Sequence, residues 1–317
     1  MGTQAKALRA SDKIIIPGQI EAVDSIKPKV RSRSQAAAYV ELTKPRITFL
    51  IVLTAAAGFC MATVGAINYV GLLNTTLGIT ILSSGIAALN QYLERVTDGL
   101  MRRTAGRPLP AKQIGETPAL VFGILLSAIA EGYLAYFVNP LTAFLGLVGF
   151  ASYLFVYTPL KTRTTLCTAI GAIPGAVPAL MGWAAARGSI GTGGWVLFAI
   201  LFLWQFPHFF AIAWMYREDY ARAGIKMLPV IDPEGRITGQ QIILYTVMLV
   251  PVSLLPTLLH LTGQVYFYGA LVLGLAFLFF GIRTAIVCSS LEARRLLQAS
   301  VIYLPLLWIL MVLNQVN

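Results

Sequence analysis

The hydrophobic positions of the chain fall into long runs separated by short polar breaks. From Leu42 onward there are nine such runs, each close to the 20 or so apolar residues that a helix needs to cross a bilayer. The runs lie at 47–66, 70–93, 117–137, 140–157, 166–186, 194–215, 241–261, 266–287 and 298–316. The pattern predicts an all-α, polytopic membrane protein with nine transmembrane helices.

The fifth run is the least regular, because Gly171, Pro174, Gly175 and Pro178 interrupt it. A broken helix is tolerated in lipid where it packs on protein or lines a cavity, so this segment is a candidate cavity wall. Small residues also allow ordinary close packing of helices, and that interpretation stays open.

Composition excludes several other classes of protein. The chain is 57% hydrophobic and 12% charged, with a mean hydropathy of +0.74, which excludes a soluble globular enzyme and a disordered chain. Its three cysteines, Cys60, Cys167 and Cys288, show no paired spacing and do not indicate a disulfide scaffold.

Positive charge gives the expected orientation. With nine spans and the N-terminus inside, 23 of the 24 Lys and Arg residues lie on the cytoplasmic side and only Arg187 lies outside. The net charge of +11 is therefore dispersed by topology and does not indicate a nucleic-acid partner. Residues 1–40 are expected to form a basic, mobile cytoplasmic segment at the lipid head groups, and residues 41–317 the membrane domain.

The row Asn90, Glu94 and Asp98 is the clearest candidate for chemistry. These residues recur every four positions and, on a continuing helix, project from one face. Two carboxylates and an amide suit Mg²⁺, and the arginines that follow suit the phosphates of a substrate. The alternative is a solvated helix end with paired charges. Carboxylates for a metal beside arginines for an anion point to a diphosphate substrate.

Several further segments, taken in chain order with this row, resemble the UbiA-type intramembrane prenyltransferases, and within them the protoheme IX farnesyltransferases. The resemblance covers roughly residues 38 to 317. The matching segments are Thr-Lys-Pro-Arg at 43–46, Met-x-Arg-Thr at 101–104, Arg-Pro-Leu at 107–109, Tyr-Thr-Pro-Leu-Lys at 157–161, Gly-Ala-Ile-Pro-Gly at 171–175, Trp-Gln-Phe-Pro-His-Phe at 204–209, Asp-Tyr at 219–220 and Ala-Gly-Ile-Lys-Met-Leu-Pro at 223–229.

The resemblance implies transfer of the farnesyl group of farnesyl diphosphate to the 2-vinyl group of heme b with addition of water. The products are heme O and diphosphate, and the protein is implied to lie in the cell inner membrane, its central cavity open to the cytoplasm. The implied catalytic residues are Asn90, Glu94, Asp98, Arg103 and Lys161. The implied diphosphate-binding residues are Lys44, Arg46, Arg103, Arg107, Tyr157 and Lys161.

The resemblance also implies Mg²⁺ held by Asn90, Glu94 and Asp98, with Asp219 as the candidate ligand of a second metal ion. The chain departs from the family at two points: Glu94 replaces the commoner aspartate, and the paired aspartates of quinone-type relatives are missing near 216–220. Imidazole is a common iron ligand, so His208, with Trp204, is predicted to contact heme. His208 as a core histidine bonded to a neighbouring helix is the alternative.

Two other functions compete with this one. A prenyltransferase with a quinone precursor or chlorin acceptor is disfavoured by the missing aspartates and by the histidine at 208. A transporter would bind its ion near the membrane midplane, whereas the acidic row lies at one membrane face. The resemblance further implies a heme A synthase or a terminal oxidase as the partner that receives the product.

Overall fold

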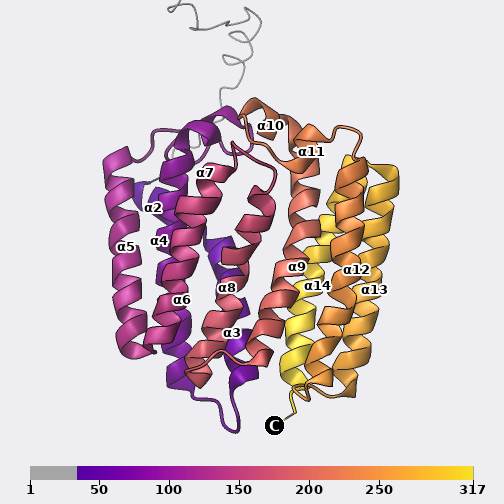
Figure 1. Ribbon diagram of the computed structural model, residues 1–317. Helices are drawn as coiled ribbons and strands as arrows, with labels where there is room; N and C mark the ends of the chain where they lie inside the picture. The colour runs from indigo at the N-terminus through magenta and orange to yellow at the C-terminus, as the bar shows by residue number, and fades with distance from the viewer. Residues whose placement is uncertain (1–33, 317) are drawn as a thin grey trace, which may run out of the picture.

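The computed structural model describes residues 34–316, which form a bundle of long, roughly parallel and antiparallel helices (Figure 1). Within these residues, nine helices are long and apolar enough to cross a membrane, so the all-α, nine-span prediction is confirmed. They are α3 Pro45–Ala62, α4 Tyr69–Leu100, α5 Glu116–Phe137, α6 Pro140–Ala151 with its continuation to Leu160, α8 Cys167–Arg187, α9 Thr192–Met215, α12 Arg236–Leu258, α13 Gln264–Val287 and α14 Ser290–Leu313. Most of the predicted N-terminal segment 1–40 lies outside the described residues.

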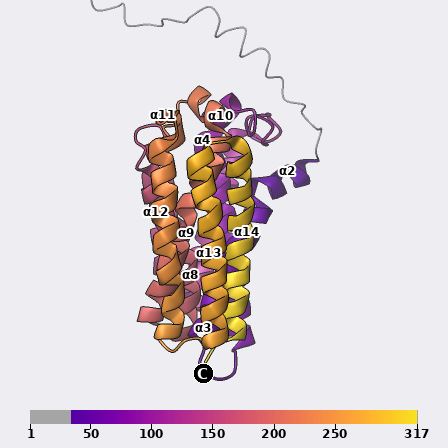
Figure 2. The ribbon, with the colours of Figure 1, turned by 90° about the vertical axis from the view of Figure 1, so that its right-hand side faces the viewer.

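The helices α3, α8 and α9 lie in the middle of the bundle, with α4 to α6 on one side and α12 to α14 on the other (Figure 1). Burial agrees with this arrangement. In the central helix α8, 67% of the apolar stretch is buried inside the protein, whereas in the peripheral helix α5 the share is 22%. The short helices α2 Gln35–Leu42, α7 Thr158–Leu160, α10 Arg217–Arg222 and α11 Leu228–Ile231 gather toward one end of the bundle (Figures 1 and 2). That end carries the polar residues predicted to form the site.

Helix α8 differs from its prediction. It runs without a break from Cys167 to Arg187 although Pro174 and Pro178 lie inside it. Neighbouring helices enclose it on most sides, and such packing lets a membrane helix keep its course through prolines. The expectation of an interrupted helix was therefore wrong. The same helix does line the central cavity, as predicted.

Two local features position the site. Helix α4 continues seven residues past its predicted end at 93, to Leu100, so the acidic row stays helical. The chain after α6 forms a π-helical turn, Ser152–Tyr157, which leads into α7 and on to Lys161. Turns of this kind inside α-helices often occur at functional sites. Here the turn brings Tyr157 to the cavity.

Candidate functional site

The acidic row forms one face of the last turns of α4, as its spacing predicts. Asn90 and Asp98 are almost fully buried, with 1% and 0% of their surface exposed, and the Glu94 side chain is 13% exposed. The predicted alternative of a solvated helix end does not fit this burial. Buried carboxylates need partners, and each one in the row has a cation beside it.

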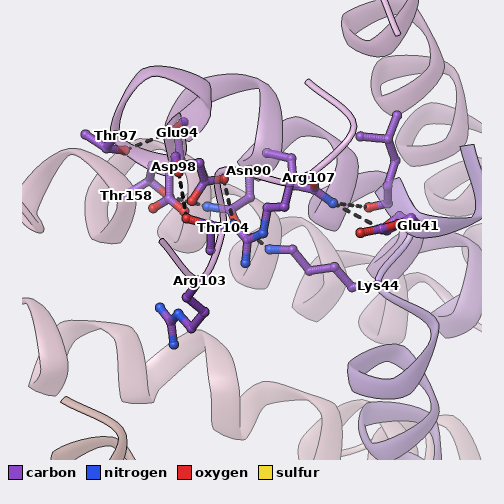
Figure 3. Close-up of polar contacts among 12 residues, drawn as sticks. Glu41, Lys44, Asn90, Glu94, Thr97, Asp98, Arg103, Thr104, Arg107 and Thr158 are labelled. Carbon is purple, nitrogen blue, oxygen red and sulfur yellow. Dashed lines mark hydrogen bonds and ion pairs between the residues drawn. The ribbon is translucent and has the colours of Figure 1, made fainter. Parts of the chain in front are cut away.

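Three cations from three separate segments pair with the row. Figure 3 shows two of them, Lys44 and Arg107, beside the row. The Lys44 ammonium donates to Asn90 Oδ1 at 2.7 Å. The Lys161 ammonium lies 2.5 Å from Glu94 Oε1, and the Arg107 guanidinium lies 2.6 Å from Asp98 Oδ2. We call these six residues the charge ladder; it joins α4 to the start of α3, the end of α7 and the loop after α4.

The backbone around Lys44 is specialised for this contact. Lys44 caps the N-terminus of α3 in the left-handed conformation, at φ 48° and ψ 59°, which is uncommon for a residue with a side chain. Pro45 follows at the first helical position, where its fixed φ suits a helix start. The Gln91 amide donates to the carbonyls of Glu41 and Leu42 and so ties α2 to α4. These constraints hold Lys44 against the row.

The two lysines of the ladder respond differently to burial. Burial, reinforced by the charge of Arg107 and opposed by Glu94, lowers the pKa of Lys44 to about 7. Burial alone would also lower the pKa of Lys161, but the Glu94 carboxylate raises it well above the usual range. Lys161 is therefore a permanent cation, whereas Lys44 changes charge near neutral pH.

The oxygen atoms of the row can accept a further ligand. Asp98 Oδ1 is buried and accepts no hydrogen bond, whereas Oδ2 of the same group binds Arg107. An unpartnered buried carboxylate oxygen fits a hard cation such as Mg²⁺. Among residues 34–316, no cluster of three Asp, Glu, His or Cys side chains with the geometry of a metal centre is found. The available ligands are two carboxylates and an amide.

The structure places Arg103 and Asp219 in a neighbouring group. The Arg103 side chain points away from Asp98 and Arg107 (Figure 3). Its guanidinium covers the rings of Tyr216 and Tyr220 and donates to the Tyr220 hydroxyl at 2.9 Å. Asp219 accepts from the Arg103 backbone N–H at 3.2 Å and pairs with Arg222 at 2.7 Å. Arg46, also predicted to bind diphosphate, is exposed on the first turn of α3.

A cavity of about 400 Å³ extends from the ladder into the bundle. Lys44 and Tyr157 line the end beside the ladder, and most of the remaining wall is apolar. On α8 the lining runs from Gly171 to Met181, a rise of about 15 Å at 1.5 Å per residue. Tyr157 also lies 4.4 Å from the Lys161 ammonium, measured to the ring centroid. The geometry suits a ligand with an anionic head and a long apolar tail.

The predicted heme contacts lie on α9 at the same cavity. Trp204 and His208 both line it, and their rings stack with centroids 4.7 Å apart. His208 Nδ1 lies 2.8 Å from Ser300 Oγ, and Trp204 Nε1 donates to the Ser300 carbonyl at 2.9 Å.

Sequence reasoning assigned no role to Gln205 or Ser300. Gln205 precedes His208 by three residues in the same cavity wall, a spacing that would have identified it. Ser300 has no such local signal, because its contacts with α9 depend on tertiary packing.

Comparison with known proteins agrees with this architecture. A protein from Solibacter usitatus named "Protoheme IX farnesyltransferase" is 51% identical over 286 residues, which cover 87% of this chain and 98% of the relative. One of the same name from Koribacter versatilis is 45% identical, over 87% of this chain and 93% of the relative.

Solved structures share the fold. A UbiA homolog from Archaeoglobus fulgidus, described as bound to GPP and Mg²⁺, superposes with a TM-score of 0.64 at 16% identity, over 86% of this chain and 99% of that one. A digeranylgeranylglyceryl phosphate synthase gives a TM-score of 0.72 at 15% identity, over 88% of this chain and 98% of that one. The profile of the UbiA prenyltransferase family matches residues 51–312. With nine spans, a buried acidic row and relatives that it matches over nearly their whole length, the chain belongs to the UbiA prenyltransferase family.

Proposed function

We propose that this protein transfers the farnesyl group of farnesyl diphosphate to the 2-vinyl group of protoheme IX, with addition of water, giving heme O and diphosphate. The observation that carries the proposal is the charge ladder at one end of a long apolar cavity. The names of the relatives favour heme as the acceptor. A heme A synthase or a terminal oxidase is the proposed recipient of the product.

The acidic row is the proposed Mg²⁺ site. Asn90, Glu94 and Asp98 supply the oxygen ligands that this ion prefers, and Asp98 Oδ1 is already unpartnered. When bound, Mg²⁺ neutralises charge that develops on the departing diphosphate. Asp219, held beside Arg103, is the proposed ligand of a further ion.

The cations of the ladder are the proposed diphosphate clamp. Lys44 lines the cavity, and Arg107 and Lys161 pair with Asp98 and Glu94 of the adjoining row. Guanidinium groups can bind phosphate through two hydrogen bonds. Preorganised positive charge stabilises the leaving group as its bond to farnesyl breaks. Tyr157 orients Lys161 through its ring, and Arg103 and Arg46 attract the substrate from outside the ladder.

The apolar cavity contributes by excluding water. Loss of diphosphate leaves an allylic cation, which the vinyl group of heme must reach before solvent does. Apolar walls around the farnesyl chain keep water away until the carbon–carbon bond has formed. His208 and Trp204 are the proposed contacts of the porphyrin on the α9 side of the same cavity.

The ladder end of the bundle is proposed to face the cytoplasm of the inner membrane. Nearly all of the Lys and Arg residues outside residues 1–33 lie in segments at that end, and Arg187 is at the opposite end of α8. Positively charged loops remain on the cytoplasmic side during insertion. Farnesyl diphosphate would then enter from the compartment in which soluble diphosphates are present.

The decisive experiment is mass spectrometry of heme extracted after purified protein is incubated with reduced heme b, farnesyl diphosphate and Mg²⁺. We expect hydroxyethylfarnesyl heme in the complete mixture and none in a parallel mixture without Mg²⁺. If heme stays unmodified and an aromatic quinone precursor is prenylated, the acceptor is a quinone precursor and not heme. No prenylation of any acceptor would contradict the enzyme's proposed reaction.

A pH dependence follows from Lys44. We expect affinity for a farnesyl diphosphate analogue to weaken as pH rises through about 7, because burial lowers the pKa of Lys44 to about 7 and the neutral amine no longer attracts the anion. This contribution is present below that pH and is lost as Lys44 gives up its proton above it. Calorimetric titrations of wild type and Lys44→Arg on both sides of neutral pH measure it. Parallel curves for the two proteins would rule out Lys44 as the cause.

A further inference from the structure

Two side chains on α9 that carry hydrogen-bond acceptors line the cavity. Gln205 and His208 are three residues apart, so their side chains leave the helix on the same side, and both line the cavity. Gln205 is buried, with 4% of its surface exposed. The hydrogen bonds of the two side chains determine which atoms remain available.

The Gln205 amide is fixed with its oxygen available. Nε2 donates to the carbonyl of Ala172 at 3.0 Å and to that of Leu201 at 3.2 Å, so both amide hydrogens are used. The opposite orientation would place Oε1 against two carbonyl oxygens. A Cβ on Gly175 would lie 1.9 Å from Oε1, so the oxygen occupies space that only glycine leaves at the cavity wall.

The His208 ring is fixed in one tautomer. The Ser300 hydroxyl lies 2.6 Å from the Leu297 carbonyl and donates its only hydrogen there. Ser300 Oγ must then accept the bond from His208 Nδ1, 2.8 Å away, since otherwise the lone pair of Nδ1 would face a lone pair of Oγ. Nδ1 therefore carries the proton, and Nε2 keeps a free lone pair.

We propose that Gln205 Oε1 and His208 Nε2 hold the water that completes the reaction, and that Nε2 accepts its proton. The inference rests on the proposed function and deepens it. When the C1–O bond of farnesyl diphosphate breaks, its electron pair leaves with diphosphate. The vinyl π pair forms the bond to C1 and leaves a cation on the carbon next to the pyrrole ring. A lone pair of water forms the C–O bond there, and the released proton goes to Nε2.

The two acceptors explain why hydration is favoured over elimination. The same cation can lose a proton and become an alkene that lacks the hydroxyl group. A water whose two hydrogens point to Oε1 and Nε2 directs its lone pair away from them, toward the cation. General bases of this kind contribute about 10²-fold or more to proton-transfer steps. A lone pair bound to the heme iron could not act in this way, so ligation of iron by His208 is the competing outcome.

The test compares products of wild type, Gln205→Met and His208→Ala incubated with reduced heme b, farnesyl diphosphate and Mg²⁺. The readout is the composition of the farnesylated heme that each variant forms, whatever its rate. We expect the hydroxylated fraction of that product to fall about tenfold or more, and a product lighter by one water to take its place. An unchanged hydroxylated fraction would overturn the inference. So would a changed absorption spectrum of heme bound to His208→Ala with hydration intact, since that identifies an iron ligand. Wild type that forms no farnesylated heme would instead overturn the proposed function.

Ser300 is inferred to be the positioning residue, and it provides a milder test. Ser300→Ala removes the acceptor for Nδ1, so the tautomers exchange and the hydroxylated fraction is expected to fall, whereas Ser300→Thr restores it. Ser253→Ala is the matched control, because Ser253 is equally buried and bonds Leu249 and Tyr303 away from the cavity. Equal product ratios in Ser300→Ala and Ser253→Ala would show that Ser300 is only structural and overturn its role.

Discussion

Replacement of Asp98 by alanine is expected to reduce farnesyl transfer by about a hundredfold or more at saturating Mg²⁺. The substitution removes the unpartnered oxygen proposed to bind the ion and leaves the Arg107 guanidinium without its carboxylate. Both changes act on the departing diphosphate. The initial rate of farnesylated heme formation measures the effect, and size-exclusion chromatography in detergent checks that the variant is folded.

The matched control for Asp98→Ala is Glu116→Ala. Glu116 also pairs with an arginine, at 2.8 Å from Arg95, but its side chain is 61% exposed at the start of α5. Exposed ion pairs contribute little, so this variant is expected to keep wild-type activity. Undiminished farnesyl transfer by Asp98→Ala with Mg²⁺ present would show that the acidic row is not the metal site.

Replacement of Gly182 by valine is expected to prevent stable folding, with a loss of about 3 kcal/mol or more. A Cβ at this position would lie 1.9 Å from the backbone carbonyl oxygen of Ala55, so α3 and α8 could not keep their approach. Gly58 on α3 belongs to the same contact between the two helices. A Cβ on Gly58 would lie 2.5 Å from the carbonyl oxygen of Ala179 on α8. Close backbone approach through small residues is a main source of helix association in membranes.

Thermal unfolding in detergent, with the yield of monodisperse protein, measures the effect of Gly182→Val. The control is Gly132→Ala on α5, because a Cβ there meets no heavy atom within 4 Å. Wild-type stability of Gly182→Val would show that α3 and α8 separate at little cost.

Hydropathy predicts the existence of the spans better than their ends. The ninth span was predicted from residue 298, whereas α14 begins at Ser290. Charged residues in its first turns lower the local hydropathy, but Glu292 pairs with both Arg283 and Arg295, which makes the charge compatible with a helix. Likewise, the prolines within α8 predict a break when only the local sequence is considered. The helix is continuous because neighbouring helices enclose it.

The site shows the same limit. The four-residue spacing of Asn90, Glu94 and Asp98 was sufficient to predict one helical face. Their partners could not be predicted, because Lys44 and Lys161 lie 46 and 67 residues away in sequence and reach the row only through the packing of α3 and α7. The assignment of Arg103 and Arg46 to the diphosphate remains a prediction.

The charge ladder has a consequence for the order in which ligands bind. Each of the three cations in the ladder is already engaged by a group proposed to hold the metal. A diphosphate that draws Lys44, Arg107 and Lys161 toward itself frees the oxygens of the row, and a metal on those oxygens frees the three cations. The coupling free energy is reciprocal, so each ligand raises the affinity for the other by the same factor. We therefore expect the protein to bind free Mg²⁺ weakly and to take it up together with the diphosphate.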